Sequence, residues 1–165
     1  MTNFQSKANF IWQVADDILR GSFKQHEYGD VILPFVVLRR LDCVTEDTKD
    51  SVIEAHEKFK ATIPEEQLYS VLSSVAKLKF YNTSLYNLNR LTQGSKNIEQ
   101  NFNNYINGFS PNVYEIFENF QIEKIVTKLV KNKLLFQLVD KFTEVELHLS
   151  FHFDKFKNYL TKSLN

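Results

Sequence analysis

The most informative stretch of this sequence is Ser110-Pro-Asn-Val-Tyr-Glu-Ile-Phe-Glu-Asn-Phe120. Ser110 suits the capping position of a helix, and Pro111 suits the first helical position, where its missing N–H is not needed. A buried face would come from four apolar residues at helical spacing: Val113, Ile116, Phe117 and Phe120. The stretch therefore predicts an amphipathic helix that begins beside Ser110.

Helical periodicity continues on both sides of this stretch. After it, apolar residues predict helices at about 122–131 and 133–142. Before it, a helix is predicted to stop at Gly108, on a repeat formed by Ile98, Phe102, Tyr105 and Ile106. A short helix before Gly94 is suggested by Leu85, Leu88 and Leu91. Pro64-Glu-Glu66 predicts another helix, with proline at its first position and acids in its first turn.

The N-terminal third predicts a helix over about 7–20, ended by Gly21, and a longer helical segment over about 26–60. The first half of that segment is apolar on nearly all sides, which indicates a buried helix. Because Pro34 lacks an N–H and clashes with the preceding turn, we expect a kink or a fresh helix start there. The second half, over 46–60, is mostly charged and is expected on the surface.

Composition favours one domain built from helices. The chain has 165 residues, 43% of them hydrophobic, with 15 Phe and 7 Tyr for the core and only 4 Gly and 3 Pro to interrupt helices. No strand-like alternation persists. We therefore predict an all-α, compact multi-helix domain of about seven helices over residues 1–149, and a tail over 150–165 that could form a short helix.

Charge, cysteine content and apolar runs bear on DNA binding, on disulfides and on the compartment of the protein. Twenty basic and twenty acidic residues cancel, so any contact with DNA has to come from a local patch. A single cysteine, Cys43, excludes an internal disulfide and suits a reducing compartment. No signal peptide is visible, and the longest apolar run, 31–38, is much shorter than the roughly 20 residues of a membrane span. We expect a cytoplasmic protein without a membrane partner.

Several strings in this sequence resemble one family in residues and in order. They are Trp12-Gln-Val-Ala-Asp-Asp-Ile-Leu-Arg-Gly21, Glu27-Tyr-Gly-Asp-Val-Ile-Leu-Pro34, Leu38-Arg-Arg-Leu-Asp42, Phe80-Tyr-Asn82, Tyr105-Ile-Asn-Gly-Phe109, the 110–120 stretch and Leu134-Leu-Phe-Gln-Leu-Val-Asp-Lys-Phe142. Together they resemble the N-terminal helical domain of the modification (M) subunit of type I restriction-modification systems, the HsdM family of DNA methyltransferases. The resemblance covers about 10–148. From Ser150 onward it fails, and Leu149 stands where the family usually has proline.

The resemblance implies transfer of a methyl group from S-adenosylmethionine to the exocyclic amine of adenine. That chemistry needs a glycine-rich turn after a strand and, in this family, an Asn-Pro-Pro-Phe-type loop for the flipped base. The glycines at 21, 29, 94 and 108 are isolated, and no Pro-Pro occurs. We therefore expect no catalytic or cofactor-binding residues, no methyltransferase activity and no S-adenosylmethionine binding by this chain alone; the family's catalytic domain would follow this region.

The functional prediction is a non-catalytic domain that assists subunit assembly and DNA engagement. By resemblance, its partners would be the specificity subunit, other M subunits and the DNA backbone. Two alternatives remain open: a stand-alone helical adapter or competitor that docks on methyltransferase subunits, and a truncated, non-functional remnant. Catalytic and specificity subunits encoded immediately downstream would favour the first interpretation.

Basic residues are the candidates for DNA contact. Lys124, Lys128 and Lys131 fall at i, i+4 and i+7, opposite the apolar face of the predicted 122–131 helix. Lysines in such a row suit phosphate contacts, although charged outer faces are also ordinary on amphipathic helices. Arg39 and Arg40 are further candidates, and with Asp42 they fit an internal ion pair equally well.

Other candidate sites are weaker. His148 and His152 have the spacing of a zinc pair, but a third ligand is not evident, and we predict no metal site. Cys43, beside Leu41 on a predicted helix, is expected to be a buried thiol rather than a nucleophile. Asp16 and Asp17 point about 100° apart on a helix, so a partner for Arg20 is the better interpretation than paired catalytic acids.

Overall fold

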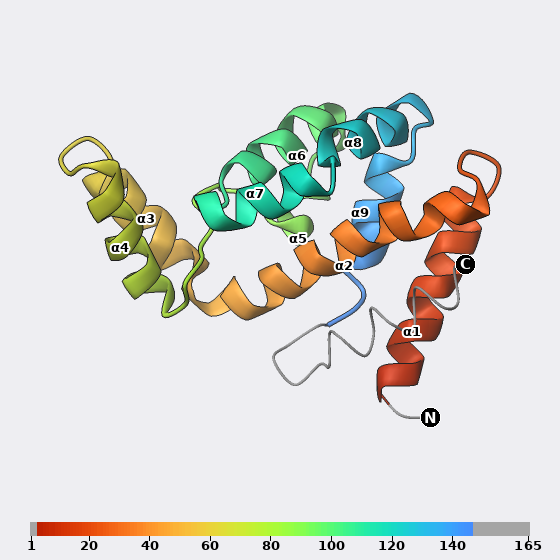
Figure 1. Ribbon diagram of the computed structural model, residues 1–165, viewed down its shortest axis with the longest axis horizontal. Helices are drawn as coiled ribbons and strands as arrows, with labels where there is room; N and C mark the ends of the chain where they lie inside the picture. Colours follow the sequence, from red (N-terminus) through yellow and green to blue (C-terminus); the bar gives the residue numbers. More distant parts are fainter. Residues whose placement is uncertain (1–2, 147–165) are drawn as a thin grey trace.

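A long central helix, α2 (Tyr28–Thr45), organises the fold. The computed structural model describes residues 3–146, and within that range the chain forms helices and turns, with two isolated β-bridges and no strand. Figure 1 shows α2 running across the molecule, with α1 at one end, the α3–α4 pair at the other, and α6, α7 and α8 alongside its middle. The all-α prediction is confirmed. The predicted tail over 150–165 and the boundary at 149 lie outside the described residues.

Of the two alternatives expected at Pro34, a kink or a fresh helix start, the fresh start is wrong, because α2 continues through this residue. Pro34 is buried, and the adjacent Phe35 is fully buried, so tertiary packing on most sides of α2 offsets the one missing backbone hydrogen bond. The break comes instead at Thr45, whose hydroxyl donates to the carbonyl of Leu41 at 2.7 Å. A 3-10 turn, Glu46–Thr48, then leads into α3 (Lys49–Phe59).

The N-terminal helix, α1 (Asn3–Val14), begins before the predicted start at about residue 7 and continues as a π-helical turn, Ala15–Leu19. Gly21 follows with φ +89°, a left-handed conformation that glycine adopts without steric cost. The predicted end of this helix at Gly21 is thus confirmed.

At the opposite end of α2, α3 and α4 (Glu65–Ala76) form a helical hairpin. Pro64 was predicted at the first position of α4, but it occupies the capping position, and the helix begins one residue later at Glu65. The hairpin has a small core of its own, formed by Val52, Leu72, Ala76 and Tyr81. Its α3 side is less exposed than expected, because Val52 and Lys49 are buried.

The main core lies where α2 meets the C-terminal helices. These are α5 (Leu88–Leu91), α6 (Ile98–Asn107), α7 (Pro111–Asn119), α8 (Ile122–Lys131) and α9 (Leu135–Phe142). The part of the chain that the structure describes therefore contains nine α-helices, compared with about seven predicted. The largest fully buried side chains include Phe35, Phe102, Tyr105, Phe117 and Phe142.

Three details of the predicted helices are wrong. Ile116 was expected on the buried face of α7 but is 44% exposed, and Leu85 lies outside α5 and is 65% exposed. Ser110 does hold the capping position of α7, but its hydroxyl makes no capping bond. Instead, that hydroxyl accepts a hydrogen bond from the backbone N–H of Tyr81 at 3.2 Å.

Candidate functional site

The lysines predicted to contact DNA lie on α8, but they differ in environment. Lys124 and Lys131 are exposed, and no carboxylate of the described residues lies within ion-pair distance of either. Lys128 is partly buried: its ammonium lies 3.1 Å from the Glu27 carboxylate and 4.4 Å from the centre of the Phe23 ring. It therefore joins α8 to the segment before α2, whereas Lys124 and Lys131 have no ion-pair partner among residues 3–146.

The two arginine candidates differ in burial, and neither is fully exposed. Arg39 is only 8% exposed, and its guanidinium donates to the carbonyls of Val145 at 2.6 Å and Thr143 at 3.2 Å. These carbonyls follow the C-terminus of α9, where a cation is favoured electrostatically. Arg40 is partly buried and also has an interaction partner. Arg39 therefore joins α2 to the end of α9.

The structure also places the weaker candidate residues, except for the two histidines. Cys43 is buried, as predicted. Asp16 pairs with Arg20 at 2.6 Å, also as predicted. Within residues 3–146, no group of three or more potential ligands is placed to hold a metal ion, and His148 and His152 lie outside that range.

Sequence reasoning missed a polar cluster around Asp42. Its carboxylate accepts hydrogen bonds from the Tyr105 hydroxyl at 2.5 Å and from the Leu88 backbone N–H at 2.8 Å. Although the residue as a whole is only partly buried, loss of hydration around its carboxylate raises the pKa to about 6, against the lowering effect of these hydrogen bonds and of Lys49. Burial likewise lowers the pKa of Lys49 to about 8. The cluster connects α2, α3, α5 and α6.

The raised pKa predicts that Asp42 makes stability depend on pH. Because the folded state holds this proton more tightly than the unfolded state, its contribution is complete below about pH 4 and is lost as the pH rises through about 6. Relative to Asp42→Asn, the parent should lose about 2–3 kcal/mol of unfolding free energy between pH 4 and pH 7. Urea unfolding at each pH measures this difference. Parallel pH profiles for the two proteins would show that the Asp42 pKa is not raised.

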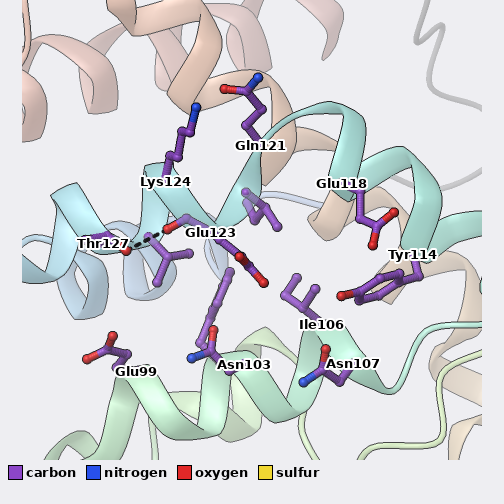
Figure 2. A pocket seen from close by; sticks show the side chains of 13 residues that line it. Glu99, Asn103, Ile106, Asn107, Tyr114, Glu118, Gln121, Glu123, Lys124 and Thr127 are labelled. Carbon is purple, nitrogen blue, oxygen red and sulfur yellow. Dashed lines mark hydrogen bonds between the residues drawn. The ribbon is translucent and has the colours of Figure 1, made fainter.

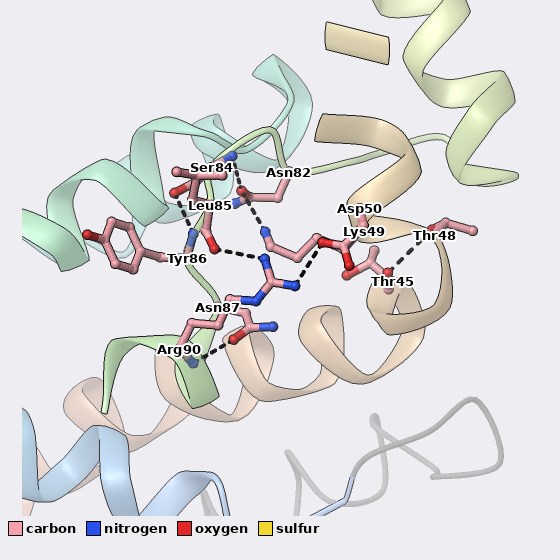
Figure 3. Close-up of polar contacts among 10 residues, drawn as sticks. All are labelled: Thr45, Thr48, Lys49, Asp50, Asn82, Ser84, Leu85, Tyr86, Asn87 and Arg90. Atoms are coloured by element: carbon pink, nitrogen blue, oxygen red, sulfur yellow. Dashed lines mark hydrogen bonds and ion pairs between the residues drawn. The ribbon is translucent and has the colours of Figure 1, made fainter. Parts of the chain in front are cut away.

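A second polar junction forms around Asn82, which is 5% exposed (Figure 3). Its amide donates to the Tyr105 carbonyl at 2.9 Å, and its side-chain oxygen accepts from the Ser84 N–H at 2.8 Å and from the Lys49 ammonium at 3.3 Å. The Thr83 N–H also donates to the Gly108 carbonyl at 2.8 Å. The strings 80–82 and 105–110 thus meet in one structural junction.

Surface cavities lie on both sides of α7. The first, of about 570 Å³, lies between α6, α7 and α8 (Figure 2). The second, of about 640 Å³, lies between the α3–α4 hairpin and the α6–α7 pair. Another, of about 450 Å³, lies between the start of α2 and α8 and includes Lys124 and Lys128 in its lining.

None of the described helices combines the length and the apolar character needed to cross a membrane.

No curated protein and no solved structure gives a match to this chain. The amino-acid sequence does match the HsdM N-terminal domain over residues 7–142, which is well over half of the chain. This match and the all-α fold confirm the resemblance to the M subunit. The chain belongs to the HsdM N-terminal domain family, the N-terminal domain of the modification subunit of type I restriction-modification systems.

Proposed function

We propose that this domain has no catalytic role of its own and helps an M subunit to assemble with its partners and to engage the DNA backbone. The observation that supports DNA engagement is the pair Lys124 and Lys131, exposed on α8 without a carboxylate partner among the described residues. Lys133, also exposed, lies two residues after the last residue of the helix. Unpaired ammonium groups on one face can replace the counterions of DNA phosphates without reading the bases.

The size of the lysine patch sets the strength and character of the binding. Two or three phosphate contacts give weak, sequence-independent affinity that falls with salt, with a logarithmic slope of about 2–3. In an intact M subunit, such contacts would hold DNA near a catalytic domain that supplies the S-adenosylmethionine site. Holding the substrate there raises the chance that a flipped adenine is captured. Methyl transfer and cofactor binding thus belong, in this proposal, to the catalytic domain.

Charge reversal on α8 tests the DNA part of the proposal. Lys124→Glu with Lys131→Glu should weaken low-salt binding of a DNA duplex at least about ten-fold and reduce the salt slope by about two, because two phosphate contacts are lost. Fluorescence anisotropy across a salt series measures both quantities. Lys128 is left unchanged, because its ammonium belongs to the ion pair with Glu27.

The matched control places the same charge change elsewhere. Lys77 and Lys96 are exposed lysines outside α8, so Lys77→Glu with Lys96→Glu changes the net charge equally. This control should retain most of the affinity. Equal losses in the two variants would mean that net charge, and not the α8 surface, governs binding, and the proposed interface would be wrong.

A further inference from the structure

The first and second cavities form one groove along α7. They share three lining residues, Asn107, Tyr114 and Glu118, so they meet where α6 and α7 lie side by side. We call the combined feature the α7 groove. It passes from the α3–α4 hairpin, over the α6–α7 seam, to α8. With cavities of about 570 and 640 Å³, it has room for several side chains of a bound peptide.

The α7 groove has a base of apolar side chains that are mostly buried in the fold, and tyrosines along its walls. In the first cavity the apolar lining residues are Phe102, Ile106, Ile122 and Val126. In the second they include Leu68, Leu72 and Phe109. The tyrosines are Tyr69, Tyr81 and Tyr114, and the rings of Tyr69 and Tyr81 lie 5.8 Å apart. Tyrosine rings can pack against apolar groups and can attract cations over their faces.

Charge in the groove is almost entirely of one sign. Five carboxylates line it: Glu65, Glu99, Glu115, Glu118 and Glu123. None of the five forms an ion pair within the described part of the chain. The basic and titratable lining residues are Lys124 and His56, and Figure 2 shows Lys124 extending away from α6 while Glu118 and Tyr114 point into the space between the helices.

We propose that the α7 groove binds a segment of a partner protein in which lysine or arginine alternates with apolar side chains. Its apolar side chains would pack against the partly exposed Leu68 and Tyr114 above the base, and its cations would lie between the glutamates and over the tyrosine rings. The exposed amides of Asn103 and Asn107 can accept and donate hydrogen bonds to a peptide backbone. The same carboxylates repel phosphate, and the groove meets the α8 lysine surface at Lys124, which lines its edge. The inference rests on the assembly part of the proposed function.

Calorimetric titration of the full chain with a short acetylated peptide of alternating arginine and leucine tests the proposal. We expect saturable binding in a one-to-one ratio. A peptide of arginine and serine should bind more weakly because it cannot cover the apolar base, and one of glutamate and leucine should not bind. Backbone amide resonances of Tyr114 and Asn107 should shift during the first titration. Absence of binding by the arginine–leucine peptide, or equal binding of the arginine–serine peptide, would overturn the proposal.

A pair of variants locates the binding to the groove. Glu115→Gln with Glu118→Gln should weaken arginine–leucine binding about five-fold, since each exposed ion pair contributes modestly. Glu46→Gln with Glu54→Gln removes the same charge at exposed positions outside the groove and should leave the affinity unchanged. Equal weakening in both variants would overturn the assignment to this groove. The groove variant retains Lys124 and Lys131, and removing two carboxylates from a lining that includes Lys124 should leave its DNA affinity unchanged or raise it. Loss of peptide binding in the parent while DNA binding persists would therefore overturn the groove proposal and leave the DNA part of the proposed function standing.

Discussion

Replacing Phe35 with alanine should lower the free energy of unfolding by about 3–5 kcal/mol. Phe35 is fully buried on α2, and its ring lies 5.7 Å from the ring of Phe102 and 5.8 Å from that of Phe142. The substitution therefore removes contacts that join α2 to both α6 and α9, and it leaves a cavity that close-packed neighbours fill only in part. Urea unfolding followed by circular dichroism measures the change.

Phe136 offers a matched control on α9. It is only partly buried and lies outside the main core, so Phe136→Ala should cost far less, about 1 kcal/mol. The loss for Phe35→Ala is a large fraction of the stability of a domain of this size. If both variants unfolded at the parent's urea midpoint, the contact of α2 with α6 and α9 would not be the centre of the fold.

The helices themselves could be predicted because their signals are local. The spacing of apolar residues gave α8 its observed bounds, and Gly108 marks the end of α6 as expected. The break near Thr45 could not be placed in the same way. Pro34 is the stronger local breaker, and only the packing around α2 shows why the helix continues through it.

The burial and the partners of individual side chains were harder to predict from the sequence, because they depend on tertiary contacts. Ile116 has helical spacing with Val113 and Phe117, yet nothing in residues 3–146 covers it enough to bury it. Lys128 looked equivalent to Lys124 and Lys131, but Glu27, its partner, lies 101 residues away in the chain. A charge pattern on one helix cannot reveal such a partner, because the pairing depends on how α8 packs beside the start of α2.

Asp42 shows a similar limit. Within the sequence it is the last residue of Leu38-Arg-Arg-Leu-Asp42 and reads as a partner for Arg39 or Arg40. In the fold its carboxylate instead receives hydrogen bonds from Tyr105 and from the first residue of α5, while Arg39 turns toward the carbonyls after α9. The sequence does not show that these groups meet in a buried cluster, because Asp42, Tyr105 and Leu88 belong to three different helices.

Replacing Gly108 with alanine should destabilise the domain by about 2–4 kcal/mol. The φ of this residue is −80°, so left-handed backbone geometry is not the reason. A Cβ atom at this position would lie 2.7 Å from the Ser84 backbone nitrogen and 2.8 Å from the Asn82 side-chain oxygen. Real carbon atoms do not approach that closely, and the clash falls on backbone and on a buried amide rather than on a flexible side chain.

The expected consequence is loss of the junction that joins α6 to the 80–84 segment. To relieve the clash, Asn82 has to move from the Tyr105 carbonyl and the Ser84 N–H, and buried polar groups left without partners are costly. Gly94→Ala is the control: its Cβ would meet nothing within 4 Å, so its stability should change by less than about 1 kcal/mol. Urea unfolding compares the two variants, and the Asn82 side-chain amide resonances should shift only in Gly108→Ala. Equal stability of the two alanine variants would mean that the 80–84 segment can withdraw without loss, and that the junction does not fix the position of α6.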